Sequence, residues 1–368
     1  LLLRKYKEKI LNNIKNIVMT DTLLFLSIVI ISILGLTLLY TATNQDIDIV
    51  IRQATRLLFC FTLMIIIGAI DINKIKMIAP YIYLVCLILL MFTIFWGHDS
   101  KGAKRWIIIF GFSLQVSEIL KVALPVFLAW FLSLSEDKEI DIQKLLLCFI
   151  IIFLPIIFII KQPDLGTSLI ILICGLISLF LGGIKKKHIL YISGLFLILA
   201  PLAWKFLLLP YQIKRIMTLI DPTSDPLGSG YHIIQSKIAV GSGGLFGKGF
   251  LNGTQSQLEF LPERGTDFIF SVLSEEFGFF GVIILFTLYF IIIIRCVHIT
   301  SKAKTYFSKI LSGSITCIFL FLILTNISMT IGVLPVVGVT LPLLSLGGSS
   351  LLSIFIAFGI MFSINRRI

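Results

Sequence analysis

Ten long apolar stretches, separated by short polar connections, dominate this chain of 368 residues. A membrane-spanning helix needs roughly 20 mostly apolar residues. Candidate spans lie near 22–43, 54–70, 78–96, 117–135, 144–161, 166–183, 188–209, 268–294, 310–334 and 345–364. The composition agrees, because only 14% of the residues are charged, whereas soluble domains carry about 25%. The sequence therefore predicts an all-α polytopic membrane protein with about ten transmembrane helices.

The positions of Lys and Arg predict how these helices are oriented, because cytoplasmic connections carry an excess of basic residues. Most of the 31 basic residues fall on the connections of one parity, including the run 185–187 and both chain ends. We therefore predict a basic cytoplasmic N-terminus (1–21), a single transmembrane domain (22–364) and a cytoplasmic C-terminus (365–368). The longest connection, 210–267, is then a large extracytoplasmic loop between helices 7 and 8. The net charge of +12 reflects this topology, so no nucleic-acid partner is predicted.

Charged residues inside apolar spans are candidates for function, because a charge in lipid is expensive. Glu118 and Lys121 are three residues apart and share one face of the fourth span. They either lock helix packing as a pair or line an outward-facing cavity. Asp164 lies where two spans meet. Glu275 and Glu276 follow each other near the start of the eighth span, and at least one of them is expected to face a polar cavity or to find a donor.

Glycine and proline mark two unusual segments on the outer side. The stretch "LPVVGVTLPLLSLGGSS" (334–350) breaks an apolar region, and lipid does not tolerate exposed irregular backbone, so it should be buried in protein or line a cavity. The glycine-rich stretch "GSGGLFGKGFLNG" (241–253) does not match a nucleotide-binding loop. Its glycines are expected to allow tight turns close to another surface.

The stretch "LEFLPERGTDFIF" (258–270) places Glu263, Arg264 and Asp267 at the mouth of the eighth span. Pro262 and Gly265 are expected to keep the backbone out of helix there, which leaves the Asp267 carboxylate at the rim of the membrane domain. The alternative is a capped helix in which Asp267 is an ordinary first-turn acid, favoured by the helix dipole.

Six motifs, taken in order, resemble the SEDS (shape, elongation, division and sporulation) family of bacterial cell-wall polymerases. They are "GAKRWI" (102–107), "SEILK" (117–121), "KQPDLGTS" (161–168), "DPLGSGYHIIQSKIAVGSGGLFGKG" (225–249), "NGTQSQLEFLPERGTDFIFSVLSEEFG" (252–278) and "GVLPVVGVTLPLLSLGGSS" (332–350). The resemblance covers roughly 20–365, and the stretch after Asn252 is most similar to the elongation branch. The chain departs from the family pattern at Gly265, where His is common.

The resemblance implies a peptidoglycan glycosyltransferase with ten membrane helices and a large outer loop. Its substrate would be lipid II, a disaccharide-pentapeptide on undecaprenyl diphosphate, polymerised into β-1,4-linked glycan strands during cell elongation and rod-shape maintenance. An α-linked donor that gives a β-linked product is inverted, which implies a single displacement with one general base, assigned to Asp267. The implied location is the bacterial cytoplasmic membrane. The implied partners are a class B penicillin-binding protein transpeptidase and the cell-elongation complex.

The remaining site residues divide into two groups. The diphosphate concentrates negative charge that Arg can grip with two parallel hydrogen bonds. Substrate binding is assigned to Arg105, Lys121, Glu118 and Arg215, and shaping of the cavity or the loop to Asp164, Gln235, Glu263 and Glu275. No cofactor is certain and no protein metal site is predicted, with a divalent cation as the open alternative. Two other functions also suit these features: a lipid II flippase, or a non-catalytic scaffold for the penicillin-binding protein.

Overall fold

The computed structural model describes residues 20–368 except 101–102, 110–111, 135–139, 186, 192–193, 195–197, 199–200, 203–204, 206–208, 226–227, 259 and 262. In this part of the chain, nine of the ten predicted spans coincide with helices. They are α2 (Thr22–Ala42), α3 (Ile47–Ala69), α4 (Ile72–Trp96), α5 (Val116–Leu132), α6 (Ile142–Lys161), α7 (Leu165–Leu181), α12 (Ile269–Lys302), α13 (Tyr306–Thr330) and α14 (Ser349–Asn365). The predicted seventh span (188–209) and the predicted N-terminal segment (1–21) lie largely outside the described residues.

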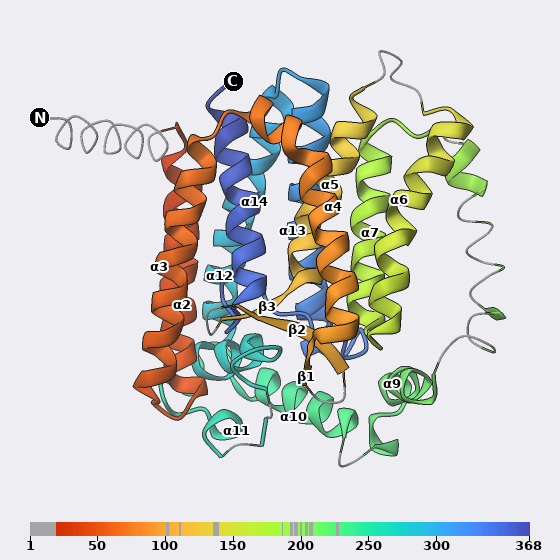
Figure 1. Cartoon of the computed structure of the whole chain (residues 1–368). Helices are drawn as coiled ribbons and strands as arrows, with labels where there is room; N and C mark the ends of the chain where they lie inside the picture. The colour runs from red at the N-terminus through yellow and green to blue at the C-terminus, as the bar shows by residue number, and fades with distance from the viewer. Residues whose placement is uncertain are drawn as a thin grey trace, which may run out of the picture.

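The helices form an upright bundle (Figure 1), and many large apolar side chains are exposed on it. Among the described residues, α2, α3, α4, α6, α12 and α13 are each long and apolar enough to cross a bilayer, while α7 and α14 are shorter apolar helices. Large apolar side chains such as Leu58 and Phe290 are 70% and 63% exposed on the bundle surface. Helix α13 is the most buried of the six long helices. The prediction of a polytopic helical membrane protein is confirmed.

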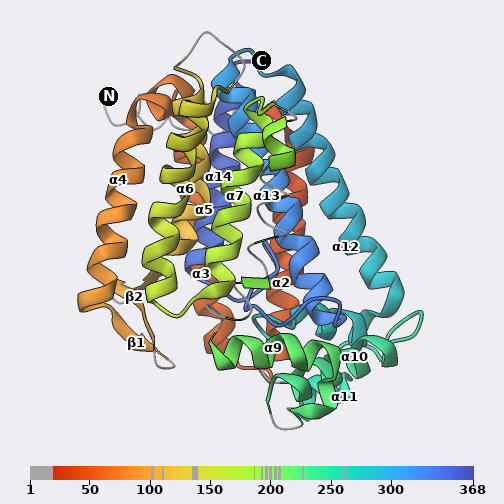
Figure 2. The same cartoon turned by 90° about the vertical axis from the view of Figure 1, so that its right-hand side faces the viewer.

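The small elements of the long connection gather at one end of the bundle. These are α9 (Pro210–Ile220), the 3-10 helix η1 (Pro222–Ser224), α10 (Ser229–Ser242) and α11 (Thr254–Gln257). They lie at the end opposite the C-terminus (Figures 1 and 2). The start of α2 lies beside the end of α14, because Asn365 Nδ2 donates to the carbonyl of Thr20 at 3.2 Å. The first and last described helices therefore begin and end on the same side.

A small antiparallel sheet occupies the connection between α4 and α5, at the same end as α9–α11. Its strands are β1 (His98–Ser100), β2 (Ala103–Ile109) and β3 (Phe112–Gln115), in the order β1-β2-β3. The all-α prediction did not include this sheet. The β-branched run 107–109 is too short to span a membrane but favours a strand, and Trp106 of β2 pairs with Gln115 of β3.

Helix α12 is interrupted at Gly278, whose φ of 62° and ψ of −161° are accessible almost only to glycine. The glycine-rich segment enters the break. The amides of 279–280 donate to the carbonyls of 244–245 at 2.9 and 3.0 Å, and the carbonyls of 275–276 accept from the amides of 248–249 at 2.9 and 3.0 Å. Four bonds to the loop thus replace two bonds within the helix. The expectation that these glycines approach another surface closely is confirmed.

Candidate active site

A cavity of about 540 Å³ lies at the end of the bundle that carries the sheet and α9. Its wall is built from β2, the start of α5, the turn between α6 and α7, α9, the turn before α12 and the segment 334–350. Six charged residues singled out in the sequence line it: Arg105, Glu118, Asp164, Arg215, Glu263 and Asp267. Folding therefore brings together in one cavity side chains that are spread over most of the chain.

Asp267 lies in a turn that immediately precedes α12. The turn is closed by the carbonyl of Glu263, which accepts from the amides of Thr266 and Phe268 at 3.1 and 3.3 Å. Glu263 itself has a positive φ of 53°. Because α12 begins at Ile269, Asp267 lies outside the first helical turn, as expected for a carboxylate at the rim and unlike the capped-helix alternative. Pro262, to which part of this effect was assigned, lies outside the described residues.

The irregular segment 334–350 forms one wall of the cavity, through 335–338, Thr340 and 346–350. The expectation that this segment is buried in protein or lines a cavity is confirmed. Gly338 lies against the Asp267 carboxylate, since a Cβ on Gly338 would be 3.7 Å from Asp267 Oδ2. The carboxylate therefore faces a wall of backbone on this side.

Arg105 ties the sheet to the turn between α6 and α7. Its Nε donates to the carbonyl of Gln162 at 2.9 Å, and its Nη2 donates to the carbonyl of Pro163 at 2.6 Å. Its Nη1 lies 3.6 Å from Asp164 Oδ2. Asp164 in turn caps α7 by accepting from the amide of Thr167 at 3.1 Å. Much of the guanidinium is thus already used to hold the turn in place.

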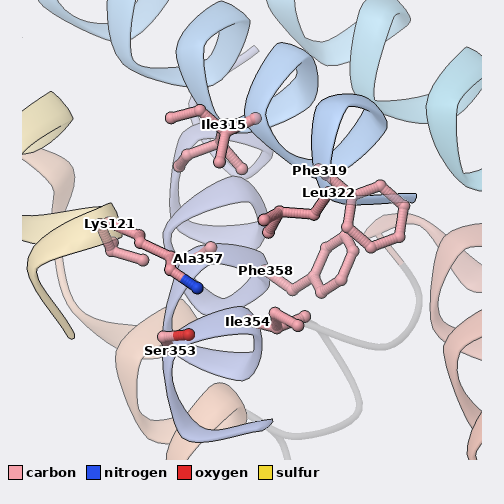
Figure 3. A pocket seen from close by; sticks show the side chains of 10 residues that line it. Lys121, Ile315, Phe319, Leu322, Ser353, Ile354, Ala357 and Phe358 are labelled. Carbon is pink, nitrogen blue, oxygen red and sulfur yellow. The ribbon is translucent and has the colours of Figure 1, made fainter. Parts of the chain in front are cut away.

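Glu118 and Lys121 form the ion pair that their spacing predicts, with 2.6 Å between Lys121 Nζ and Glu118 Oε1. The two side chains are only 14% and 8% exposed. Glu118 lines the large cavity, whereas Lys121 lines a separate crevice of about 30 Å³ against α13 and α14. Figure 3 shows its amine on the side of Ser353 in that crevice. Lys121 therefore reaches the large cavity only through its partner.

Arg215 brings a second positive charge to the large cavity, from α9. Its Nη1 donates to the carbonyl of Val336 at 3.3 Å, so α9 is joined to the irregular segment 334–350. The neighbouring Lys214 pairs instead with Asp225, at 2.9 Å. The cavity therefore carries arginines from two separate elements, β2 and α9.

Glu275 and Gln235 do not line the cavity. The carboxylate of Glu275 is fully buried and accepts from Lys248 Nζ at 2.7 Å, from Thr254 Oγ1 at 3.1 Å and from the amide of Gln255 at 2.9 Å. The expectation that at least one of the two adjacent glutamates finds a donor is confirmed, and Glu275 organises the loop. Gln235 is half-buried on α10.

Several polar residues that line the cavity were not singled out from the sequence: Gln115, Thr167, Gln212, Thr266, Ser349 and Ser350. Ser349 Oγ accepts from the amide of Gln115 at 2.8 Å and donates to the carbonyl of Ser113 at 3.2 Å, which joins β3 to the start of α14. Behind the wall, Asn326 is fully buried in α13. The sequence offered one signal for Asn326, a single amide side chain within an apolar span.

The cavity carboxylates do not form an evident metal centre. Across the residues that the structure describes, no group of three or more His, Cys, Asp or Glu side chains is arranged to hold a metal ion. The charged groups of the cavity are instead distributed over its walls and engaged with neighbouring backbone and side chains.

Comparison with known proteins shows which family this chain is similar to. The sequence pattern of the family FTSW_RODA_SPOVE, described as "Cell cycle protein", matches residues 14–368. The chain is 42% identical to the protein named Peptidoglycan glycosyltransferase MrdB of Escherichia coli (strain K12), over 95% of this chain and 93% of that one. It is 31% identical to Peptidoglycan glycosyltransferase RodA of Treponema pallidum (strain Nichols), over 94% and 98%.

Solved structures are similar as well. One belongs to a study described as "Structural coordination of polymerization and crosslinking by a peptidoglycan synthase complex", with a TM-score of 0.82, 28% identity and coverage of 94% of this chain and 98% of that chain. Another is the rod shape determining protein RodA of Thermus thermophilus, with a TM-score of 0.71, 25% identity and coverage of 94% and 96%. The chain therefore belongs to the FtsW/RodA/SpoVE family of cell cycle proteins.

Proposed function

We propose that this chain is a peptidoglycan glycosyltransferase that polymerises lipid II into β-1,4-linked glycan strands during cell elongation and rod-shape maintenance. One observation carries the proposal: a single cavity of about 540 Å³ holds the Asp267 carboxylate together with Arg105 and Arg215. A glycosyl transfer from a lipid diphosphate needs these two kinds of group, a base for the acceptor and cations for the leaving group. The similarity to MrdB of Escherichia coli and RodA of Treponema pallidum supports the proposal.

The proposed reaction is a single displacement. The 4-hydroxyl oxygen of the acceptor sugar attacks the anomeric carbon of the donor, the new C–O bond forms, and the bond from that carbon to the diphosphate oxygen breaks. The hydroxyl proton passes to the Asp267 carboxylate, and the electron pair of the broken bond leaves with undecaprenyl diphosphate. A diphosphate leaves without being protonated, so one base suffices. Attack opposite the leaving group converts the α-linked donor into a β-linked product.

The charge on the leaving diphosphate is assigned to the two cavity arginines. Arg215 is exposed at the cavity with its Nη1 on the carbonyl of Val336. Arg105 already donates to two backbone carbonyls, so we assign it a double role: it holds the turn that carries Asp164 and offers its remaining donors to the diphosphate. Lys121 acts through Glu118, to which its ammonium is paired.

We further propose that the protein resides in the bacterial cytoplasmic membrane with both termini in the cytoplasm. The cavity would then open on the outer side, beside the loop 210–267, where a membrane-bound donor and an external glycan can meet. The proposed partners are a class B penicillin-binding protein transpeptidase and the cell-elongation complex. Similarity to a chain from the peptidoglycan synthase complex supports a transpeptidase partner.

A flippase or a scaffold would use the same bundle differently. A flippase needs polar groups along a path through the membrane, whereas the lining of the large cavity comes from one end of the bundle. This distribution favours the enzyme. A scaffold needs no rim carboxylate at all.

Purified protein in detergent micelles, mixed with lipid II, separates the enzyme from the two alternatives, because no bilayer is available to flip across and a scaffold forms no polymer. We expect glycan polymer on a gel from the protein alone or with its transpeptidase partner. A parallel reaction with a chelator reports whether a divalent cation is required. Lipid II left unpolymerised under both conditions, by protein that binds it, would contradict the enzyme.

A further inference from the structure

The backbone around Asp267 is held by donors that come from distant parts of the chain. The three consecutive carbonyls of 265–267 each accept one hydrogen bond from outside the turn. In order, the donors are the amide of Leu346 at 2.8 Å, Ser345 Oγ at 2.6 Å and Asn326 Nδ2 at 2.9 Å. Regular secondary structure does not fix the turn, so these bonds determine where its residues lie.

Asn326 makes a second hydrogen bond, to the wall segment that faces the Asp267 carboxylate. The same Nδ2 donates to the carbonyl of Val339 at 2.6 Å. Val339 follows Gly338, the residue that faces the carboxylate of Asp267. One amide group therefore joins the backbone of the proposed base to the backbone of the wall beside it, and it sets the spacing between them.

Stability alone does not explain an amide at this position. Asn326 is fully buried in α13, and a polar side chain at membrane depth is costly unless its groups are paired. Among the described residues, its Oδ1 has no hydrogen-bond partner. Within the described part of the chain, the hydrogen bond of its neighbour Thr325 stays in the same helix, to the carbonyl of Phe321 at 2.8 Å. Asn326 is thus a buried amide with one end satisfied, and that end points at the turn of Asp267.

We propose that Asn326 is a positioning residue for Asp267: it holds the carboxylate at the distance from the Gly338 wall at which the acceptor hydroxyl is deprotonated. This rests on the proposed role of Asp267 as the base. Asn326 itself touches neither substrate nor the reacting atoms. A displacement of about 1 Å can slow a reaction by roughly 100-fold, so loss of this bridge is expected to reduce turnover and to leave binding intact.

The first test is Asn326→Leu, which keeps the branched outline of the side chain and removes both bonds. The polymerisation rate and the binding of lipid II are measured on the same purified sample. We expect kcat to fall by about 10–100-fold, with the stoichiometry and Kd of lipid II binding within about threefold of the parent. Thr325→Val is the matched control, because it removes a hydrogen bond one residue away on the same helix, and its kcat should equal that of the parent.

The second test asks whether Asn326 acts through Asp267. In an Asp267→Asn background, adding Asn326→Leu should cause no further loss, because groups that act as a unit are not additive. An equal further loss would overturn the inference. If Asn326→Leu does not fold, Asn326→Ala replaces it, since it removes the N–H donor and adds neither bulk nor charge. The same fall in kcat is expected.

The outcomes separate this inference from the function on which it rests. Full polymerisation by folded Asp267→Asn overturns the assignment of the base. An inactive Asp267→Asn combined with parental kcat in both Asn326 variants overturns only the positioning role. The positioning role is also overturned if, in both variants, the fraction of protein that binds lipid II falls as much as the rate. The lost activity would then reflect misfolded protein, and Asn326 would serve folding.

Discussion

The buried pair Glu118–Lys121 yields a quantitative prediction, because removing one charge should destabilise the protein far more than removing both. The two charges are 2.6 Å apart, and neither side chain is more than 14% exposed. Water therefore screens them little. Replacing either residue by Ala leaves the other charge without its partner in an apolar bundle, which costs about 3–5 kcal/mol. An exposed helical pair three or four residues apart would contribute only about 0.2–0.5 kcal/mol.

The double variant Glu118→Gln with Lys121→Met removes both charges and keeps the volumes. The flexible methionine side chain also fits beside the crevice of about 30 Å³. We expect the free energy of unfolding of the double variant to lie within about 1 kcal/mol of the parent value. Replacing a buried ion pair by well-packed uncharged groups often changes stability little. The polymerisation rate of the double variant can still fall, because Glu118 lines the large cavity. Unfolding and polymerisation are therefore measured separately.

Unfolding can be followed with a thiol-reactive fluorogenic dye, because five of the six cysteines are buried and only Cys317 is exposed. Replacing Cys317 by Ser in all variants removes the dye signal that this exposed thiol would give before the protein unfolds. At about 2 °C per kcal/mol, each single variant should unfold roughly 6–10 °C below the parent, and the double variant within about 2 °C of it. A double variant that is as destabilised as the sum of the single variants would show that the residues are not coupled.

Three further predictions follow from particular contacts. Arg105→Lys should lower the polymerisation rate by about tenfold or more, because Lys lacks the planar fork that serves two carbonyls and Asp164 at once. Lys104→Arg is the control and should leave the rate unchanged. A fully active Arg105→Lys would remove Arg105 from the site. Gly278→Ala should destabilise the protein by more than the roughly 1–3 kcal/mol of backbone strain, because the added Cβ would also collide with the backbone of Leu245 and Gly247; an unchanged unfolding temperature would contradict the described break in α12. In a cysteine-free background, a cysteine at Asn252 should react with an impermeant thiol reagent in intact cells and one at Ser301 only after lysis; the reverse pattern would invert the topology.

The bundle could be predicted from the sequence because each span is a long apolar run with polar ends, and the bilayer requires such runs to be helices. The sheet was missed for a local reason. Its β-branched run, 107–109, is short and is flanked in the sequence by glycines at 102 and 111, so neither length nor periodicity identified it. The break in α12 was missed because it depends on Gly278 meeting a loop some 30 residues earlier in the chain, which no local pattern reveals.

Most of the charged cavity residues could be found from the sequence, because a charge in an apolar chain stands out. Their contacts could not. Arg105 was expected to grip a ligand, and its bonds to the turn at 162–164 come from tertiary packing. Lys121 was expected at the substrate, yet its ammonium lies behind Glu118. Asn326 carries no charge, and its connection to Asp267 exists only once α13 and the turn are packed together.

The most direct test of the central claim is the initial rate of lipid II polymerisation by purified Asp267→Asn in detergent, beside the parent. Asparagine keeps the shape of the side chain and removes its ability to accept a proton. A general base contributes about 10²–10⁴-fold to rate, so we predict a fall of that size, with lipid II binding and unfolding temperature unchanged. Near-parental polymer from a folded Asp267→Asn protein would contradict the account.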